Sequence, residues 1–371
     1  MNHQHESGPR VRVAVVFGGR NSEHAVSLMG AGSVLSAIDR SKYEVVPIGI
    51  APDGRWVLVS EEQRYEIEDG ELPAVDGSGT SLALPSASGS IVALEAGRIP
   101  ASLGQVDVVF PMLHGPYGED GTIQGLLEMA GVRYVGSGVL ASAVGMDKAY
   151  MKTLLAAAGL PVGPYVVVRD RDWRVDRERV LKDIETLGWP VFVKPSRAGS
   201  SQGISRADDF QGLERAIELA REHDPKVLVE AAIEGREIEC AVLESPGDEP
   251  PAASLPGEVV VNDDHEFFDF SAKYIGSDMS LTVPADLPVE VSDDLRQMAV
   301  QAFEALGCEG LSRVDFFYTP SGRLILNEIN TMPGFTAMSV APQLWAATGV
   351  PYAELVDRLI QLALARPEGL R

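Results

Sequence analysis

Three polar side chains near the C-terminal end of the chain have the types and spacing of a cation site. Segments 311–318 and 323–329 are largely apolar and are joined by a Thr-Pro-Ser-Gly turn, so they predict a β-hairpin. Residues two apart on a strand share a face, so Glu328 and Asn330 point together, and Asp315 can join them from the other strand. Carboxylate and amide oxygens are the ligands that Mg²⁺ and Mn²⁺ prefer. The pattern therefore predicts a metal site on one face of this hairpin.

The alternative is that this hairpin face is an ordinary solvated one. The apolar residues Val314, Phe316 and Ile325 are expected on the opposite face, and so tightly specified a strand pair favours the metal site. The loop TMPGFT follows, and Gly334 within it permits a tight turn whose backbone N–H groups can stabilise an oxyanion. Taken alone, Gly334 is equally consistent with a plain loop glycine.

A second candidate is the segment VFVKPSRAGSSQGI, in which a strand ending at Lys194 leads into a Gly/Ser-rich loop. Small residues let backbone amides approach phosphate oxygens, and the hydroxyls of Ser200 and Ser201 add donors. Lys194 supplies a point charge. The Walker pattern is absent, so the chain is not a P-loop nucleotidase. The segment predicts a phosphate clamp or, failing that, a flexible surface loop.

Two acidic residues flank a short connection between strands further along the chain. Glu230 closes one strand and Glu237 begins the next. Backbone groups at such a hinge can bind adenine, and Glu237 can reach ribose hydroxyls. Without other support, the pattern is also typical of an ordinary strand connection.

Four further residues are candidates for substrate binding, two at strand ends and two in a long loop. Glu23 and His114 each follow a predicted strand, and ligands of open α/β sheets bind beyond the carboxyl ends of the strands. Glu23 can hold an ammonium group or act as a helix N-terminal acid favoured by the dipole, and a lone histidine such as His114 is often structural. Lys273 and Tyr274 lie in a long polar loop with aromatic residues, which predicts either a lid or a surface loop.

The elements that position these residues begin with a strand, a helix and a second strand. Residues 11–17 are an apolar, β-branched run, and residues 43–50 are a similar one, so the N-terminal part is predicted to be a doubly wound α/β domain. Segment 61–105 is acidic and then Ser/Gly-rich, and it is expected to be an inserted hairpin or surface excursion outside the core. Asp120 and Asp147 are each placed to cap the helix that follows.

The second half of the chain alternates strands and helices less regularly. Expected strands cover 165–168, 190–194, 227–230 and 237–243, and expected helices cover 292–306 and 351–365. One dinucleotide-like pattern, GSGVLA after residue 135, lacks the acidic residue about 20 positions on, so an NAD-dependent dehydrogenase is a poor alternative.

Composition bounds the class of protein. The chain has 371 residues and a formal net charge of −23, which disfavours nucleic acid as a partner because phosphates require a basic surface. Cys240 and Cys308 are too few for a disulfide framework and are expected to be buried. The N-terminus lacks the apolar stretch of a signal peptide, and no run of about 18 apolar residues predicts a membrane span. We therefore expect a cytoplasmic protein with no membrane partner.

Taken together, the segments resemble the D-alanine–D-alanine ligase family. Eight motifs occur in order between residues 11 and 362: GGRNSEHAVS, HGPYGEDGTIQG, GMDK, VKPSRAGSSQG, EIE, SAKY, SRVDFF and NEINTMPGFTAMS. The resemblance implies α/β and α+β structure in a three-domain ATP-grasp architecture, with an N-terminal doubly wound parallel-sheet domain. The implied domains are 1–140 for substrate binding, 141–230 for the central ATP-grasp subdomain, and 231–371 for the C-terminal subdomain with the metal site and lid.

The resemblance also implies a role for each residue of the candidate site. The first D-alanine is positioned and the lid closed by Glu23, Ser200 and Tyr274, and the oxyanion is stabilised by Arg313 and Gly334. Contacts to ATP are implied for Lys148, Lys194, Ser201, Glu230, Ala231, Ile233, Glu237 and Lys273. Substrate contacts are implied for His114 and Ser339, and two Mg²⁺ or Mn²⁺ ions for Asp315, Glu328 and Asn330.

The implied activity is ATP-dependent joining of two D-alanines through an acylphosphate, for peptidoglycan precursors, by a homodimer. Two alternatives stay open at this point. One is a D-alanine–D-lactate or D-serine ligase of the same family, although Tyr274 matches the dipeptide-forming pattern. The other is a non-catalytic ATP-binding regulator, which the complete set of Arg313, Asp315, Glu328 and Asn330 disfavours.

Overall fold

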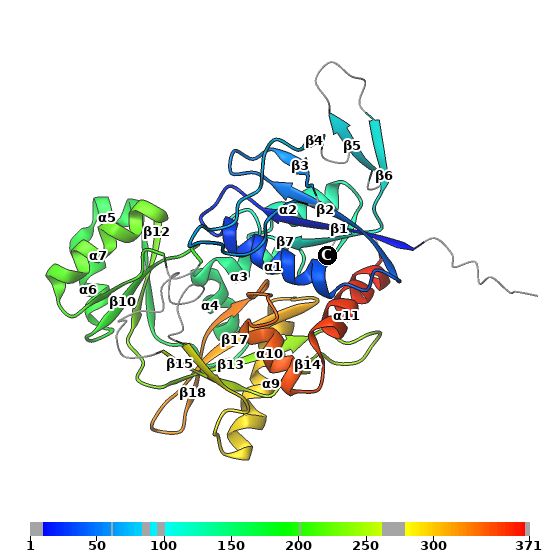
Figure 1. Cartoon of the computed structure of the whole chain (residues 1–371). Helices are drawn as coiled ribbons and strands as arrows, with labels where there is room; N and C mark the ends of the chain where they lie inside the picture. The colour runs from blue at the N-terminus through cyan, green and yellow to red at the C-terminus, as the bar shows by residue number, and fades with distance from the viewer. Residues whose placement is uncertain are drawn as a thin grey trace, which may run out of the picture.

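The structure is a computed structural model that describes residues 10–60, 62–83, 90–94, 101–199, 202–261 and 279–367. Within these ranges the strands form three sheets of eight, four and six strands. In Figure 1 the first sheet lies at the top, the second lies at the left with its helices, and the third lies below. The chain passes through them in sequence and then returns to the first sheet with its last helix.

The N-terminal sheet has a parallel part that forms as the sequence predicts. Strand β1 (Val11–Gly18) pairs in parallel with β2 (Tyr43–Ile50) and β7 (Val108–Met112), and β7 with β8 (Arg133–Tyr134). Alternate residues of β1 enter different core clusters, one shared with helix α1 (His24–Ala37) and the other with α2 (Thr122–Met129). Since alternate residues point to opposite faces, the two helices cover opposite faces of the sheet, as a doubly wound fold requires.

The segment expected to lie outside the core instead extends this sheet. Strands β3 (Trp56–Leu58), β4 (Thr80–Ala83), β5 (Ser90–Leu94) and β6 (Ala101–Gln105) add in antiparallel fashion beyond β2. Leu82 and Ile91 are buried in the core of the sheet. The expected hairpin is confirmed by the antiparallel pairs of β4, β5 and β6. The expectation that the segment lies outside the core is wrong, because a Ser/Gly-rich composition does not exclude a strand whose few apolar side chains alternate inward.

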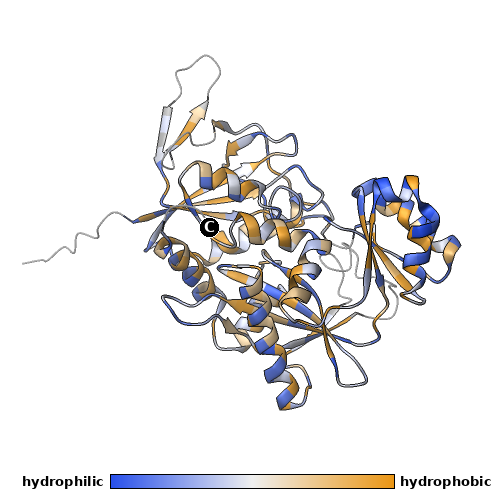
Figure 2. Ribbon diagram, turned by 180° about the vertical axis from the view of Figure 1, so that it is seen from behind, coloured by the Kyte–Doolittle hydropathy of each residue, from blue (hydrophilic) through white to orange (hydrophobic). Residues whose placement is uncertain are grey.

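The second sheet is a compact lobe with its own core. Its strand order is β11 (Ser205–Ala207), β10 (Val191–Pro195), β12 (Lys226–Ala231), β9 (Tyr165–Arg169). Helices α5 (Asp170–Val175), α6 (Arg177–Glu185) and α7 (Phe210–His223) accompany it. Figure 2 shows their hydrophilic sides turned away from the sheet, and the core cluster beneath them contains only residues between 166 and 229.

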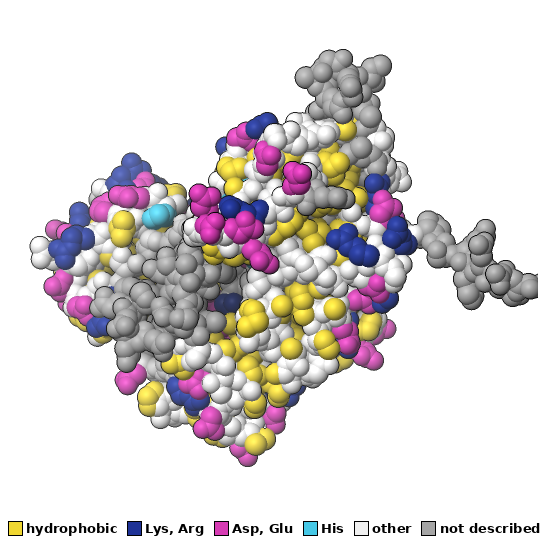
Figure 3. Space-filling view, in the orientation of Figure 1, with side chains coloured by type: hydrophobic (Ala, Val, Ile, Leu, Met, Phe, Trp, Pro, Cys, Tyr) yellow, Lys and Arg dark blue, Asp and Glu magenta, His cyan; other side chains and the backbone are white. Residues whose placement is uncertain are grey.

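Acidic and basic side chains are mixed over this lobe (Figure 3). Arg174 pairs with Asp170 at 2.8 Å and Arg179 with Asp183 at 2.9 Å. Exposed pairs of this kind contribute at most about 1 kcal/mol each. The stability of the lobe therefore rests mainly on its apolar core.

The third sheet carries the predicted hairpin. Its strand order is β16, β15, β13, β17, β18, and a sixth strand, β14, also pairs with β13. Helices α3, α4 and α9 pack on its apolar face. The bounds are β13 Arg236–Leu243, β14 Ala252–Ala253, β15 Gly257–Val261, β16 Met279–Thr282, β17 Leu311–Tyr318, β18 Leu324–Asn330, α3 Val139–Met146, α4 Lys148–Ala157 and α9 Val289–Ala305.

A β-bulge in the hairpin corrects one predicted position. Asp315 pairs with Glu328 and Phe316 with Leu326, so Asn327 falls between the two pairs. The bulge shifts the alternation, and Leu326, not Ile325, shares the buried face with Phe316. Ile325 pairs with Phe317 on the other face. The prediction for Val314 and Phe316 is confirmed, and that for Ile325 is wrong.

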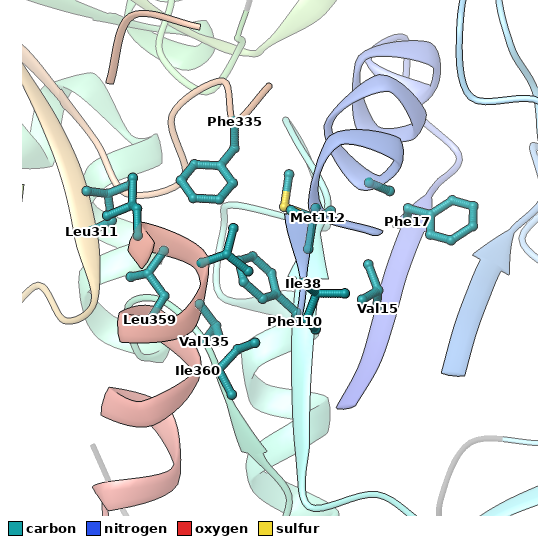
Figure 4. Packing of buried hydrophobic residues seen from close by; sticks show 14 of the residues in the cluster. Val15, Phe17, Ile38, Phe110, Met112, Val135, Leu311, Phe335, Leu359 and Ile360 are labelled. Atoms are coloured by element: carbon teal, nitrogen blue, oxygen red, sulfur yellow. The ribbon is translucent and has the colours of Figure 1, made fainter. Parts of the chain in front are cut away.

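The C-terminal helices close the N-terminal core. Helices α10 (Val340–Ala347) and α11 (Tyr352–Ala365) share one cluster with β1, β7 and α1. Figure 4 shows Phe335, Leu359 and Ile360 against Phe110 of β7, and the rings of Phe110 and Phe335 lie 5.9 Å apart. The first and last parts of the chain therefore pack together in one apolar core.

Smaller expectations had mixed outcomes. Asp147 caps α4 by accepting a hydrogen bond from the Tyr150 N–H, as predicted. Asp120 instead holds the turn before α2, accepting from the Thr122 N–H at 3.0 Å, while Gly121 occupies the cap position. Both cysteines are buried, and burial raises the pKa of each thiol to about 12. Among the described residues, every helix is too short or too polar to traverse a bilayer.

Candidate functional site

One cavity of about 650 Å³ gathers the predicted site. Its lining comes from the second and third sheets, from helices including α1 and α4 and from loops, and it includes every predicted site residue in the described part of the chain. These are Glu23, His114, Lys148, Lys194, Glu230, Ala231, Ile233, Glu237, Arg313, Asp315, Glu328, Asn330, Gly334 and Ser339. The other four, Ser200, Ser201, Lys273 and Tyr274, lie outside the described residues.

The hairpin presents its polar face to this cavity. The guanidinium of Arg313 donates to both oxygens of Asp315 at 2.7 Å and lies 2.8 Å from Glu239. Burial acts to lower the pKa of Arg313, but Asp315 and Glu239 outweigh it and raise that pKa well above its ordinary value. The Asn330 side-chain amide donates to Asp315 at 3.1 Å. Asp315, Glu328 and Asn330 thus lie on one face, as the spacing predicts.

Glu239 was not predicted as a site residue, yet its signal was available. It stands two positions after Glu237 on β13, so both side chains share a face, and both line the cavity. Of the two residues, only Glu237 was predicted to contact a ligand, the ribose. In the structure, Glu239 is the second carboxylate partner of Arg313, after Asp315.

Two lysines, Lys148 and Lys194, reach the cavity near the Gly/Ser-rich loop. Lys148 donates to the Ala198 carbonyl at 2.9 Å and lies 3.8 Å from a carboxylate oxygen of Glu328. Lys194 lies 2.5 Å from Glu230. Their positions put positive charge between the Gly/Ser-rich loop and the hairpin, where a polyphosphate would find compensation.

A third lysine, Lys152, was missed. Its side chain is only 3% exposed and lies 2.8 Å from Glu230, on the opposite carboxylate oxygen to Lys194. Burial acts to raise the pKa of Glu230, but the two ammonium groups lower it to about 2. Lys152 follows Lys148 by four residues, so the helical spacing could have indicated that it shares the cavity face.

The predicted adenine hinge lies at the end of β12. The Ala231 N–H donates to the Pro164 carbonyl at 3.0 Å, which fixes the backbone at this point. Ile233 packs against Gly163, where an added Cβ would lie 2.6 Å from the Ile233 side chain. The hinge therefore packs against Gly163 and Pro164, just before β9, and lines the cavity together with Glu237.

A buried cluster of acidic residues and a histidine also lines the cavity. Glu23 is 5% and His114 3% exposed, and His114 Nδ1 lies 3.2 Å from the Met332 carbonyl. Burial lowers the pKa of His114, against the opposing effect of Glu23. Glu119 accepts from the Gly115 N–H at 2.6 Å, and burial, with Glu23 adding to it, raises the pKa of Glu119 well above its ordinary value. Glu119, in the motif HGPYGED, was not predicted as a site residue.

Two glycines let the surrounding loops approach Glu23. Gly115 has a φ of +71°, and a Cβ there would lie 2.1 Å from a Glu23 oxygen. A Cβ at Gly199 would lie 2.8 Å from the same oxygen. The Gly/Ser-rich loop therefore comes close to Glu23 at Gly199, the residue before Ser200.

Ser339 and Gly334 belong to the loop that leads into α10. The Ser339 hydroxyl accepts from the Thr336 N–H at 3.0 Å and lies 2.9 Å from the Thr336 hydroxyl. Both residues line the cavity beside the hairpin. The loop is held from behind by Phe335, which is buried in the core shared with β7.

The fold and this cavity define a class of protein, the ATP-grasp ligases, and solved structures of that class match over nearly the whole chain. The D-Ala:D-Ser ligase VanG from Enterococcus faecalis is 37% identical, covers 96% of this chain and all of its own, and gives a TM-score of 0.81. The D-alanine–D-alanine ligase from Coxiella burnetii is 34% identical, with coverages of 96% and 94% and a TM-score of 0.78.

Sequence comparison narrows the class to one family. The family descriptions "D-ala D-ala ligase N-terminus" and "C-terminus" match residues 12–137 and 154–361. A D-alanine–D-alanine ligase from Arthrobacter sp. (strain FB24) is 59% identical, over 97% of this chain and 96% of its own. One from Streptomyces coelicolor is 55% identical, with coverages of 97% and 95%. The chain belongs to the D-alanine–D-alanine ligase family.

Proposed function

We propose that the protein joins two D-alanine molecules to D-alanyl-D-alanine for peptidoglycan precursors, converting ATP to ADP and phosphate. The observation that carries the proposal is the set of groups that share one cavity. Its lining includes the predicted nucleotide hinge with Lys148 and Lys194, the Arg313–Asp315 hairpin, and Glu23 with His114. This set suits a reaction in which a phosphoryl group passes from a nucleotide to a small amino acid.

The chemistry follows from the charges. The carboxylate of the first D-alanine, whose ammonium group is held near Glu23, attacks the γ-phosphate of ATP, and ADP leaves. Lys148 and Lys194 offset the charge of the phosphates. The amine of the second D-alanine then attacks the acylphosphate, and Arg313 with the Gly334 N–H stabilises the developing oxyanion. Ser339 binds the carboxylate of the second D-alanine, and phosphate leaves with the formation of the peptide bond.

We also propose two Mg²⁺ or Mn²⁺ ions at the hairpin. The donors fit: the carboxylates of Asp315 and Glu328 stand directly opposite each other across the ladder, and Asn330 adds an amide oxygen two pairs along, on the same face. Bound there, the ions would supply positive charge to the phosphates. Asp315 accepts two hydrogen bonds from Arg313 and one from Asn330, so a bound cation would share this carboxylate with them, and Arg313 also has Glu239 as a partner.

The remaining roles are carried by residues outside the described part of the chain and stay predictions. Ser200 and Tyr274 position the first D-alanine with Glu23, while Ser201 and Lys273 contact the nucleotide. The domain boundaries at residues 140 and 230, the homodimer and the cytoplasmic location are likewise proposed here. Sedimentation of the purified protein tests the homodimer, because a species of one chain mass at micromolar concentration would contradict it.

One assay tests the activity and separates it from its alternatives. ADP release and products are measured with ATP and no amino acid, with D-alanine alone, and with D-alanine plus D-lactate or D-serine. D-alanyl-D-alanine as the main product under every condition that contains D-alanine is expected. A mixed D-alanyl-D-serine or D-alanyl-D-lactate product in excess would favour the related ligases, and nucleotide binding without ADP release would favour a regulator.

A further inference from the structure

A buried lysine joins two parts of the cavity that the proposed chemistry treats separately. Lys152 lies one helical turn after Lys148 on α4, and its side chain is 3% exposed. Burying an ammonium group is costly unless the group is paired and hydrogen-bonded. The contacts that Lys152 makes therefore indicate what it does.

The first contact of Lys152 is with Glu230, at the proposed nucleotide hinge. Lys152 lies 2.8 Å from one oxygen of Glu230, and Lys194 lies 2.5 Å from the other. Two ammonium groups sharing one carboxylate leave a net charge of +1 on the three side chains. Without Lys152, the charges of Lys194 and Glu230 would cancel. Lys152 thus supplies the excess positive charge that a nucleotide phosphate would meet.

Its second contact is with the bulge in the hairpin. The Lys152 ammonium donates to the Asn327 carbonyl at 3.0 Å. Asn327 falls between the Phe316–Leu326 and Asp315–Glu328 pairs and is left out of the register. Backbone groups of a bulge residue need another partner when buried. Lys152 is that partner, one residue before Glu328.

We propose that Lys152 is a positioning residue for the reaction proposed above. Through Glu230 and Lys194 it sets the charge of the nucleotide pocket. Through the Asn327 carbonyl it holds the bulge that keeps Glu328 opposite Asp315. One ammonium group from α4 thereby couples the lobe that clamps the nucleotide to the strand on which phosphoryl transfer depends.

The first arm of the test is binding of ADP, measured by calorimetry on the full chain without D-alanine. Lys152→Met is expected to weaken binding by about tenfold or more, as for loss of a charge-assisted contact. Adding Glu230→Gln restores the net charge of +1, so the double variant should recover to within about threefold of wild type. Wild-type affinity in Lys152→Met, or a double variant that binds no better than Lys152→Met, would overturn the charge role.

The second arm is turnover at saturating ATP. The double variant still lacks the donor to the Asn327 carbonyl, so its kcat should stay about tenfold or more below wild type although its nucleotide binding has recovered. A wild-type kcat in the double variant would overturn the link to β18. Lys182→Met, which removes an exposed lysine on α6, is the matched control and should change neither quantity.

If Lys152→Met does not fold, the double variant, which leaves no uncompensated charge at Glu230, carries both measurements, and ADP binding more than about tenfold below wild type would then count against the proposal. The proposal rests on the ligase activity for its second arm only. A wild-type protein that forms no dipeptide refutes the proposed function, whereas the ADP arm still tests Lys152.

Discussion

Two charged side chains in the cavity each contact two oppositely charged partners. Arg313 contacts both Asp315 and Glu239, and Glu230 contacts both Lys152 and Lys194. Because each group has a second partner, it can turn toward a ligand without being left buried and unpaired. The cavity is thus prepared for charged substrates at the level of single residues.

Neutralising one carboxylate of the hairpin should remove catalysis while leaving the fold intact. Glu328→Gln keeps the size of the side chain but removes charge from the proposed metal site, so kcat is expected to fall about a hundredfold or more. Steady-state assays over a range of Mg²⁺ check this. Glu304→Gln, exposed on α9, is the control. Turnover within about threefold of wild type at saturating Mg²⁺ would remove Glu328 from the metal site.

The buried histidine should make stability depend on pH in a particular direction. Burial lowers the pKa of His114 below 6.5 in the native state, so below pH 6.5 the unfolded chain takes up a proton that the native state does not. The free energy of unfolding should therefore fall as the pH drops, by up to about 1.4 kcal/mol per pH unit from this group.

The measurement compares wild type with His114→Asn by urea unfolding at pH 7.5 and pH 5.5. The variant should lose less stability than wild type on acidification, since the group responsible is gone. Equal losses in the two proteins would mean that the pKa of His114 does not change on folding.

At the scale of elements, the bulge in β18 is the least regular part of the site. It places Asn327 and Glu328 together at the cavity and moves Ile325 away from the buried face. Deleting Asn327 should restore a regular ladder, because Leu326 then pairs with Phe316 and Glu328 with Asp315 without interruption. The carbonyl that Lys152 holds would be lost.

We expect the Asn327 deletion to fold but to lose activity, by about a hundredfold, since small displacements of reacting groups are this costly. Asn327→Ala keeps the backbone carbonyl and should stay much closer to wild type. Urea unfolding and turnover are measured on both. A deletion variant as active as Asn327→Ala would show that the bulge has no part in catalysis.

Regular elements were predictable, and departures from periodicity were not. The strand at Leu311–Tyr318 and the helix cap at Asp147 follow from local composition and spacing. The bulge at Asn327 has no local signal, because it depends on pairing with another strand. Lys152 and Glu119 were missed because burial, which makes their charges significant, is decided by elements far away in sequence.

At the scale of the whole molecule, one arginine fastens the end of the chain to two sheets. Arg366, just after α11, is 8% exposed. Its guanidinium donates to the carbonyls of Tyr134 and Gly136, at 3.4 and 2.8 Å, and pairs with Glu244 at the end of the third sheet. This side chain holds the last helix to the first sheet.

Removing that contact should destabilise the whole molecule. Arg366→Met is expected to lower the free energy of unfolding by about 2–4 kcal/mol, because Glu244 loses its positively charged partner and keeps only the Gly310 N–H, and two carbonyls lose a donor. Arg358→Met removes an exposed arginine paired with Glu354 on the same helix and should cost no more than about 0.5 kcal/mol. Equal urea midpoints for the two variants would contradict the role given to Arg366.

The core shared by the two ends of the chain also determines when each part can fold as the ribosome makes it. The lobe core needs only residues 166–229, so it is complete once that stretch has emerged. The core around β1 includes residues as late as Ala363 and cannot close before synthesis is nearly finished. Domains usually fold from the N-terminus onward during translation. In this protein we expect the lobe of residues 166–229 to fold first. The N-terminal strands, including β1 and β7, would stay partly exposed until α11 has been synthesised and can pack on them.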